Sequence, residues 1–339
     1  MRLSAGERNE SSRSFALPVN SPPLLVSFTT ADQFLQALPA DVRREFAEQI
    51  QSLLTLGLPP VVSVRCLATL FGYSPKFVGA MQRRTERYYR TFSIPRRKKK
   101  RVIHAPRVAL KVIQKWFGHH LAEAVKPADC VFGFVKGQSA IKAAALHCGS
   151  NWVYSIDIED FFPSTSITKV VEGLVTLGYP RHGAELASKL CCYQGGLSQG
   201  SPASPVLSNL VFRDADNKLM ALAQEYGVRY SRYADDIVFS GQGDFPGNLP
   251  QKAKGVIESG GWKVSPEKEW LSRRPNRLKV HGLLVHGERP RLTKGYRNKV
   301  RAFKHLLEAN RVSDEDKARI CGHLSYAKSV EAVAKQTSD

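Results

Sequence analysis

The chain has 339 residues, of which 50 are Lys or Arg and 30 are Asp or Glu, so its formal net charge is +20. Hydrophobic residues make up 42% of the sequence, which is enough to bury a core and excludes a wholly disordered, collagen-like or coiled-coil protein. The positive charge predicts a polyanionic partner, most simply nucleic acid; a basic enzyme without such a partner and an anionic membrane surface are the alternatives.

No apolar stretch approaches the roughly 18 residues that a membrane-spanning helix requires, and the first residues have no apolar core of the secretory type. We therefore expect a cytoplasmic protein that does not contact a membrane. The six cysteines include no C-x-x-C pair and no zinc-site spacing, which indicates reduced thiols.

The N-terminal part of the chain is predicted to be helical. Residues 1–25 are polar and rich in Pro and Ser, and we expect them to form a loose leader. Apolar residues then recur at helical spacing in four segments, over 31–56, 64–70, 75–89 and 108–125.

A run of six basic residues, from Arg96 to Arg101, interrupts these helices. Short apolar segments flank the run on both sides, which predicts a β-hairpin with a charged tip. A solvated basic loop is the alternative.

The middle of the chain changes to a strand pattern. Apolar and polar residues alternate over 152–158, so we expect a strand that ends near Asp157. Thr165 or Ser166 then caps a helix that runs through Leu174.

Two β-rich runs, 228–233 and 237–240, flank an Ala-Asp-Asp sequence and predict a hairpin with Asp235 and Asp236 at its apex. A short strand pair is expected around 279–285. Basic amphipathic helices are expected over 293–334.

Aspartates at a turn are most often structural, because their side chains hydrogen-bond to nearby backbone. Here the flanking residues are apolar, and carboxylates at the ends of buried strands repel one another unless cations neutralise them. Carboxylate oxygens that share a hard cation with water and substrate phosphates are typical of Mg²⁺. Two such ions about 4 Å apart can activate a hydroxyl and stabilise a leaving pyrophosphate.

Three segments resemble the motifs of reverse transcriptases, in the order that the family has them. These are the segment Ser-Ile-Asp-Ile-Glu-Asp-Phe-Phe-Pro-Ser over 155–164, the Gly-Leu-Ser-Gln-Gly-Ser-Pro-Ala-Ser-Pro segment over 196–205, and Tyr-Ala-Asp-Asp over 233–236. A lone Tyr-Ala-Asp-Asp would be weak support, whereas the ordered set of three is specific.

Within that family the chain most resembles the bacterial retron type, over about residues 65–330. The segments 89–106, 110–116 and 131–147 resemble the fingers of that group. Two positions depart from its signatures: Ala143 stands where the group has Asn, and His281 where it has Thr in Val-Thr-Gly.

The resemblance implies that Asp157, Asp235 and Asp236 are catalytic and hold two Mg²⁺ ions, with the Ile158 carbonyl as a further metal ligand. It also implies a set of dNTP-binding residues: Arg96, Arg101, Phe162, Gln199, Gly200 and Lys268.

Several of these nucleotide contacts have alternatives. Phe162 matches the steric gate against ribose, and Phe161 competes with it for that role. Lys99 or Lys100 could replace Arg101 within the basic run. Lys268 matches a general acid for pyrophosphate, although an ordinary exposed lysine would look the same.

The resemblance further implies RNA-binding residues in the C-terminal part and near the first motif: His147, His281, Gly282, Arg297, Lys299, Arg301 and Lys304. For His147 a core histidine is an equal alternative, and for the basic helix a solvated face is the alternative.

The expected fold is an α+β right-hand polymerase with fingers, a palm around an antiparallel sheet, and a helical thumb. We expect residues 1–60 to form a leader and helical extension, 61–150 the fingers, 151–270 the palm and 271–339 the thumb.

The expected activity is RNA-directed DNA synthesis from dNTPs. For a retron enzyme, the family implies a structured non-coding RNA partner and synthesis from a guanosine 2′-hydroxyl to give branched msDNA. It also implies anti-phage defence with an effector protein. The alternatives are a group II intron or diversity-generating reverse transcriptase, and a non-catalytic RNA-binding scaffold.

Overall fold

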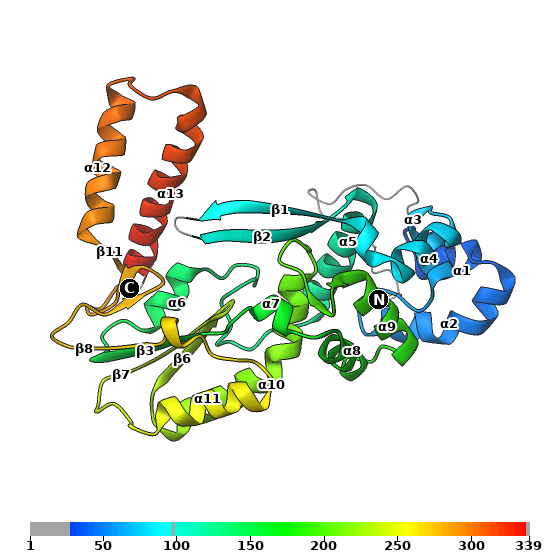
Figure 1. The fold of residues 1–339 in the computed structure, drawn as a ribbon, viewed down its shortest axis with the longest axis horizontal. Coiled ribbons are helices and arrows are strands. Elements are labelled where there is room, and N and C mark those ends of the chain that lie inside the picture. The colour runs from blue at the N-terminus through cyan, green and yellow to red at the C-terminus, as the bar shows by residue number, and fades with distance from the viewer. Residues whose placement is uncertain (1–27, 97–98, 337–339) are drawn as a thin grey trace, which may run out of the picture. The chain divides into compact units, whose positions relative to one another are not determined.

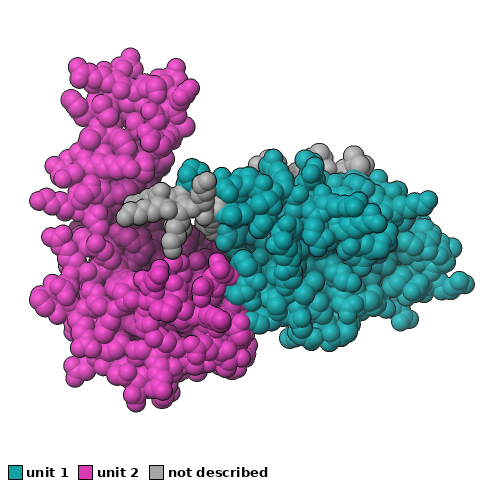
Figure 2. Space-filling model, in the orientation of Figure 1, with its two compact units in different colours: residues 1–126, 162–211 teal, residues 127–161, 212–339 magenta. Residues whose placement is uncertain are grey.

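The computed structural model describes residues 28–96 and 99–336. The chain divides into two compact units, one of residues 1–126 and 162–211 and the other of residues 127–161 and 212–339 (Figure 2). The predicted leader over 1–25 lies outside the described residues. Each unit combines segments that are distant in sequence, and the four-part division into leader, fingers, palm and thumb stays a prediction.

The first unit is mainly helical (Figure 1). Its helices are α1 (Ala31–Ala37), α2 (Ala40–Thr55), α3 (Val64–Phe71), α4 (Pro75–Arg83), α5 (Val108–Ala124), α8 (Ile167–Thr176) and α9 (Arg181–Cys191), with the 3-10 turn η1 (Thr85–Tyr88). Ser166 is the N-cap of α8 and accepts a hydrogen bond from the Lys169 amide, as predicted.

The helix expected over 31–56 is interrupted, because Leu38 is extended (ψ 143°) and Pro39 begins the next segment. A residue before proline is disfavoured in the α conformation, so one predicted helix becomes two. The helix expected over 75–89 likewise ends at Arg83, and the chain turns into a strand at Tyr89.

A long β-hairpin projects from this unit, as predicted. Strands β1 (Tyr89–Arg96) and β2 (Lys99–Pro106) pair antiparallel from Tyr89↔Pro106 to Arg96↔Lys99 (Figure 1). A second, much shorter pair joins β4 (Cys192–Tyr193) to β5 (Gly196–Leu197).

The hairpin is fixed at its base by polar contacts inside the helical core. Gln114 on α5 is fully buried and donates hydrogen bonds to the Tyr89 hydroxyl at 2.8 Å and to the Leu190 carbonyl at 2.7 Å. Both bonds come from the Gln114 Nε2 group, and they tie the start of β1 to α5 and α9.

The second unit is built on a four-stranded antiparallel sheet in the order β6-β7-β3-β8. Its strands are β3 (Trp152–Asp157), β6 (Arg229–Tyr233), β7 (Asp236–Gly241) and β8 (Trp270–Arg273). All six residues of β3 are buried, as expected for a central strand covered on both faces.

Helices cover both faces of this sheet. Helix α10 (Ser204–Glu225) and helix α11 (Leu249–Ser259) lie along one face (Figure 1). The short helix α6 (Ala140–Leu146) packs against β6 and belongs to the same hydrophobic cluster as Val153 and Val238, which point to the other face. The short helix α7 (Phe161–Ser164) follows β3, and two of the three unit boundaries fall within α7 and α10.

The C-terminal part has a small antiparallel sheet followed by two long helices. The sheet contains β9 (Lys279–Val280), β10 (Leu283–Leu284) and β11 (Arg291–Leu292), and the 3-10 turn η2 (Pro266–Lys268) precedes β8. Helices α12 (Lys294–Glu308) and α13 (Asp314–Gln336) form an antiparallel pair (Figure 1).

These elements match the expected α+β class, with an antiparallel sheet and a helical C-terminal region. Among the residues that the structure describes, no helix has both the length and the apolar character needed to cross a bilayer. All six cysteines are free thiols.

Candidate active site

Asp157 and Asp236 are directly paired across two neighbouring strands. Asp157 is the last residue of β3, Asp236 is the first residue of β7, and the two are register partners. Side chains of register partners point to the same face of a sheet, so both carboxyl groups lie on the face opposite α10. Asp235 occupies the adjoining turn, and its carbonyl accepts a hydrogen bond from the Ile158 amide at 3.1 Å.

The turn between β6 and β7 has a strained backbone. Ala234 has a φ of 60°, in the left-handed region that costs a non-glycine residue about 1–2 kcal/mol. Gly133 approaches this turn so closely that a Cβ atom on it would lie 2.2 Å from the Ala234 nitrogen. A glycine at position 133 is therefore required for the turn to close, a need that the sequence reasoning did not find.

The Asp157 side chain is 8% exposed, and its carboxyl group forms an ion pair with the ammonium group of Lys268, whose side chain is 59% exposed. Burial raises the pKa of Asp157 to about 6, and the charges of Asp235 and Asp236 act in the same direction. Lys268 opposes this shift without cancelling it. Lys268 therefore does not neutralise the carboxyl groups of this site completely, and a further cation would be bound favourably.

His281 lies beside Asp236 on the same face. Its Nδ1 atom is 3.6 Å from Asp236 Oδ2, its side chain is 7% exposed, and its ring centroid is 5.2 Å from that of Tyr233. Burial works to raise the pKa of Asp236, but hydrogen bonds to His281 and to Asp157 outweigh it and lower the pKa overall. The structure thus places a residue predicted to bind RNA next to a predicted catalytic carboxylate.

The backbone explains why a histidine fits position 281. His281 and Gly282 form the two-residue turn between β9 and β10, with φ values of 48° and 83°. Two positive φ values in succession are the requirement of a type I′ turn. Histidine tolerates that region better than a β-branched threonine does.

Divalent metal ions fit the chemistry of these side chains. The available ligands are carboxylate oxygens, which hard cations prefer, and burial, together with repulsion from Asp235 and Asp236, raises the pKa of Asp157. Within residues 28–96 and 99–336, no group of three His, Cys, Asp or Glu side chains is already arranged around a metal position. The strands bring the aspartates together, whereas Lys268 and His281 now contact two of them.

Of the two candidates for the steric gate, Phe161 belongs to the second unit and Phe162 to the first. Phe161 is buried, with its ring centroid 5.6 Å from that of Phe212, and so belongs to the core. Phe162 is half-buried, which leaves it as the better candidate for the steric gate.

The loop with Gln199 and Gly200 packs against the base of the hairpin. Ser198 donates a hydrogen bond to the His104 carbonyl at 2.5 Å, and a Cβ atom on Gly200 would lie 2.3 Å from that same oxygen. Gly200 is needed for this close approach, and Gln199 beside it is half-buried. Their role at a nucleotide stays a prediction.

The predicted phosphate-binding arginines belong to the hairpin strands. The backbone of Arg101 pairs with Ile94, and that of Arg96 pairs with Lys99. The side chains of Arg96 and Arg101 lie outside the described part of the structure.

Comparison with known proteins identifies the family. The family model described as "Reverse transcriptase (RNA-dependent DNA polymerase)" matches residues 93–282. Retron Ec86 reverse transcriptase of Escherichia coli is 29% identical over 289 residues, covering 83% of this chain and 88% of the relative. Retron Mx65 reverse transcriptase of Myxococcus xanthus is 30% identical over 313 residues, covering 84% and 72%. This chain belongs to the retron-type reverse transcriptases.

As a reverse transcriptase, the protein is an RNA-directed DNA polymerase with the right-hand fold that the sequence predicted. It uses an RNA template, dNTPs and divalent metal ions, as its family does. Among solved structures, telomerase from Candida albicans in complex with a fragment of telomeric RNA matches with a TM-score of 0.43 and 11% identity. That match covers 66% of this chain and 50% of the telomerase chain, so this reverse transcriptase spans half the length of that protein.

His147 of this reverse transcriptase is a core residue, which corrects its prediction as an RNA contact. It is fully buried, and its two ring nitrogens hydrogen-bond to the hydroxyls of Ser231 on β6 and Ser240 on β7, each at 2.7 Å. Burial lowers the pKa of His147 to about 3, so the ring is neutral. With both nitrogens engaged, the side chain links two strands and cannot reach RNA.

The basic residues of α12 are exposed, but they do not share one environment. Arg297, Arg301 and Lys304 recur at helical spacing along one side of the helix. Lys299 points to another side, where its Nζ atom is 3.2 Å from His323 Nε2 and lies 5.2 Å from the Phe303 ring centroid. RNA binding by all four residues, and by Gly282, stays a prediction.

Proposed function

We propose that this reverse transcriptase copies a cognate structured non-coding RNA into branched msDNA, starting from a guanosine 2′-hydroxyl. We further propose that it acts with an effector protein in anti-phage defence, in the cytoplasm. Membership of the retron-type family supports this assignment. The observation that carries the catalytic part is the pairing of Asp157 with Asp236 at the ends of two adjacent strands.

The proposed cofactor is a pair of Mg²⁺ ions held by Asp157, Asp235 and Asp236, with the Ile158 carbonyl as a further ligand. When bound, the ions would activate the attacking hydroxyl and stabilise the leaving pyrophosphate. Asp157 must be ionised to serve as a ligand, and burial makes its carboxyl hold a proton up to about pH 6.

Lys268 is placed to exchange its partner during the reaction. Its side chain is 59% exposed while the ammonium group contacts Asp157, which would let that group leave the carboxylate and donate a proton to pyrophosphate. The contact with Asp157 supports this proposal over the alternative of an ordinary exposed lysine.

The other proposed roles concern substrate binding. We propose that the half-buried Phe162 ring excludes a 2′-hydroxyl from the incoming nucleotide, and that Gln199 and Gly200 line the same site. Arg96 and Arg101 would bind the triphosphate, because guanidinium groups bind phosphate through two parallel hydrogen bonds. Basic residues of α12 and the turn at Gly282 would hold the RNA through phosphates and shape.

A primer-extension assay tests the catalytic proposal. Asp235→Asn is expected to lower the rate of dNTP incorporation by at least ~100-fold, because a lost metal ligand removes several kcal/mol of transition-state stabilisation. Asp244→Asn is the matched control, since Asp244 is an exposed aspartate in the loop after β7. Equal rates for Asp235→Asn and the control would refute the metal mechanism, whereas no incorporation by the wild type or either variant would favour a non-catalytic scaffold.

Sequencing the nucleic acid that copurifies with the protein from its host tests the retron part. A DNA strand covalently joined to a guanosine 2′-hydroxyl of an RNA is the expected product. Unbranched cDNA alone would favour a group II intron or diversity-generating type of enzyme.

A further inference from the structure

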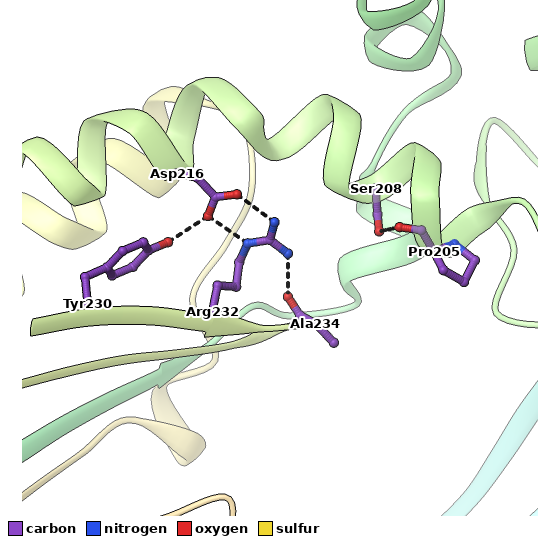
Figure 3. A network of polar contacts seen from close by, with 6 residues as sticks. All are labelled: Pro205, Ser208, Asp216, Tyr230, Arg232 and Ala234. Carbon is purple, nitrogen blue, oxygen red and sulfur yellow. Dashed lines mark hydrogen bonds and ion pairs between the residues drawn. The ribbon is translucent and has the colours of Figure 1, made fainter. Parts of the chain in front are cut away.

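A buried ion pair lies directly beneath the turn that carries Asp235. Arg232 on β6 and Asp216 on α10 are 0% and 1% exposed. The Arg232 guanidinium donates two hydrogen bonds to Asp216, from Nε to Oδ1 at 2.8 Å and from Nη2 to Oδ2 at 2.6 Å (Figure 3). Tyr230 donates its hydroxyl hydrogen to Asp216 Oδ1 at 2.7 Å, so the carboxylate is fully engaged.

The third side of the guanidinium group contacts the catalytic turn itself. Arg232 Nη1 donates a hydrogen bond to the Ala234 carbonyl at 3.1 Å (Figure 3). That carbonyl belongs to the peptide group that leads into Asp235. The next carbonyl, that of Asp235, accepts from the Ile158 amide. Both peptide groups that flank Asp235 are therefore held, and together they set the direction of its side chain.

The surroundings of Arg232 leave it in one position. Its guanidinium carbon lies 4.9 Å from the Phe212 ring centroid and 5.9 Å from that of Phe161. Its backbone amide donates to the Cys130 carbonyl, and its carbonyl accepts from the Phe132 amide, each at 2.8 Å. Helix α10 thus holds the side chain of Arg232, and the segment that contains Cys130 and Phe132 holds its backbone.

Arg232 cannot itself touch the reacting groups. Its strand register places its side chain on the α10 face, whereas Asp157 and Asp236 point to the opposite face. Any effect on catalysis must therefore pass through the backbone of the turn, whose residue Ala234 is in a strained conformation that needs outside support.

We propose that Arg232, oriented by Asp216 and Tyr230, is a positioning residue that fixes the Ala234–Asp235 peptide and so holds Asp235 ready to bind metal. This inference rests on the proposed metal-binding role of Asp235. Under this proposal the Arg232–Asp216 ion pair contributes to catalysis as well as to the packing of the core.

The test must separate positioning from stability, because removing one partner of a buried ion pair leaves an unpaired charge and unfolds many proteins. The triple variant Arg232→Met/Asp216→Leu/Tyr230→Phe removes the charges and the dependent hydroxyl together. Such replacements are often neutral for stability. We expect a melting temperature near that of the wild type, with kcat reduced ~100-fold and KM for dNTP little changed.

Direct Mn²⁺ binding, measured by calorimetry without RNA or dNTP, gives a second readout. We expect the triple variant to bind Mn²⁺ ~10-fold more weakly, as when a group that orients a metal ligand is lost. A triple variant with wild-type kcat and Mn²⁺ affinity would overturn the proposal and leave the pair a structural feature. If Asp235→Asn also binds Mn²⁺ normally, the metal site itself is wrong, which is a distinct failure.

The single variant Arg232→Lys tests the same proposal and does not require the triple variant to fold. A lysine keeps the charge opposite Asp216, but its single ammonium cannot reproduce the planar guanidinium that bonds Asp216 twice and Ala234 once. We expect a folded protein with the same loss of kcat and Mn²⁺ affinity. Full activity in Arg232→Lys would contradict the proposal.

Arg229→Met is the matched control. Arg229 is on the same strand, and it donates hydrogen bonds to the carbonyls of Leu146 and Cys148, far along β6 from the turn. We expect its removal to alter stability while leaving kcat and Mn²⁺ affinity unchanged. A loss of Mn²⁺ affinity in Arg229→Met equal to that in Arg232→Lys would show a general effect of the strand and would refute a specific role.

Discussion

The carboxyl group of Asp157 is nearly buried beside two other carboxyl groups, and burial raises its pKa to about 6 from the ordinary value of 3.8. The folded protein therefore holds a proton on this group more tightly than the unfolded chain does. Because the unfolded state releases that proton first, the free energy of unfolding falls as pH rises from about 4 to 6. Above that window the full cost of a buried charge is present.

Asp157→Asn removes this cost. In the presence of a chelator we expect the variant to exceed the wild type in free energy of unfolding by about 2 kcal/mol at pH 8, and by almost nothing at pH 4. Urea unfolding at both pH values measures the difference. The exposed Asp244→Asn should stay within about 0.5 kcal/mol of the wild type. An Asp157→Asn variant no more stable than the wild type at pH 8 would contradict the account of this carboxylate.

Phe162 gives a second prediction at this scale. Replacing its ring by the smaller Phe162→Val side chain should open space beside the sugar and lower the preference for dNTP over rNTP by ~10-fold or more. Single-nucleotide incorporation, compared as kcat/KM for the two substrates, measures this preference. Phe162→Tyr keeps the bulk and should keep the preference. Unchanged selectivity in Phe162→Val would remove this residue from the nucleotide site.

The aspartates could be found from sequence because their signal is local: each lies at a strand end within a short motif. His147 could not be assigned, because its burial depends on Ser231 and Ser240, which are 84 and 93 residues away. Arg232 did carry a signal, a charged residue within an apolar strand pattern. Its partner Asp216 is on another element, so only the fold reveals the pair.

At the scale of elements, the catalytic hairpin depends on the segment that passes beside it. Gly133 lies against the turn, and a Cβ atom there would be 2.2 Å from the Ala234 nitrogen and 2.9 Å from the Tyr233 carbonyl carbon. These are backbone atoms, which cannot move aside as a flexible side chain would. The β6–β7 turn must shift if position 133 gains a methyl group.

Gly133→Ala is therefore expected to lower both stability and activity. The overpacking should cost about 1–3 kcal/mol, and a displaced turn should lower kcat ~100-fold. Chemical denaturation and primer extension measure the two effects. Gly243→Ala is the matched control, because nothing lies within 4 Å of a Cβ atom at that position. A Gly133→Ala enzyme as stable and active as the control would show that the turn is more adaptable than its contacts indicate.

The elements themselves were largely predictable from periodicity, and the exceptions have identifiable causes. The hairpin around the basic run, the catalytic hairpin and the C-terminal helices are present as expected. The helix over 31–56 is divided at Pro39, which the rule for residues before proline could have indicated.

At the scale of the whole molecule, the grouping of segments could not be predicted. The second unit joins residues 127–161 to residues 212–339, across 50 residues that belong to the other unit. Periodicity describes one element at a time, and it contains no information on which distant elements share a core. The net charge, in contrast, is known from the sequence and predicts how the molecule responds to salt.

Helix α12 contributes a continuous part of that charge. Arg297, Arg301 and Lys304 are exposed and share one side of the helix, whereas Lys299 is beside His323 and Phe303 on another side. A nucleic-acid backbone along α12 would meet the first three together. Each phosphate neutralised by such a residue releases a counterion, so the affinity depends on salt concentration.

We therefore expect Arg297→Gln/Arg301→Gln/Lys304→Gln to weaken binding to structured RNA and to reduce the slope of log affinity against log salt by about 2–3. Fluorescence anisotropy over a series of KCl concentrations measures both quantities. Lys299→Gln should change the slope by less than about 1, because its ammonium group lies beside His323 and Phe303, on another side of α12 from Arg297, Arg301 and Lys304. A triple variant with the wild-type slope would place the RNA elsewhere on the molecule, and a larger effect from Lys299→Gln would assign the contact to the opposite side of α12.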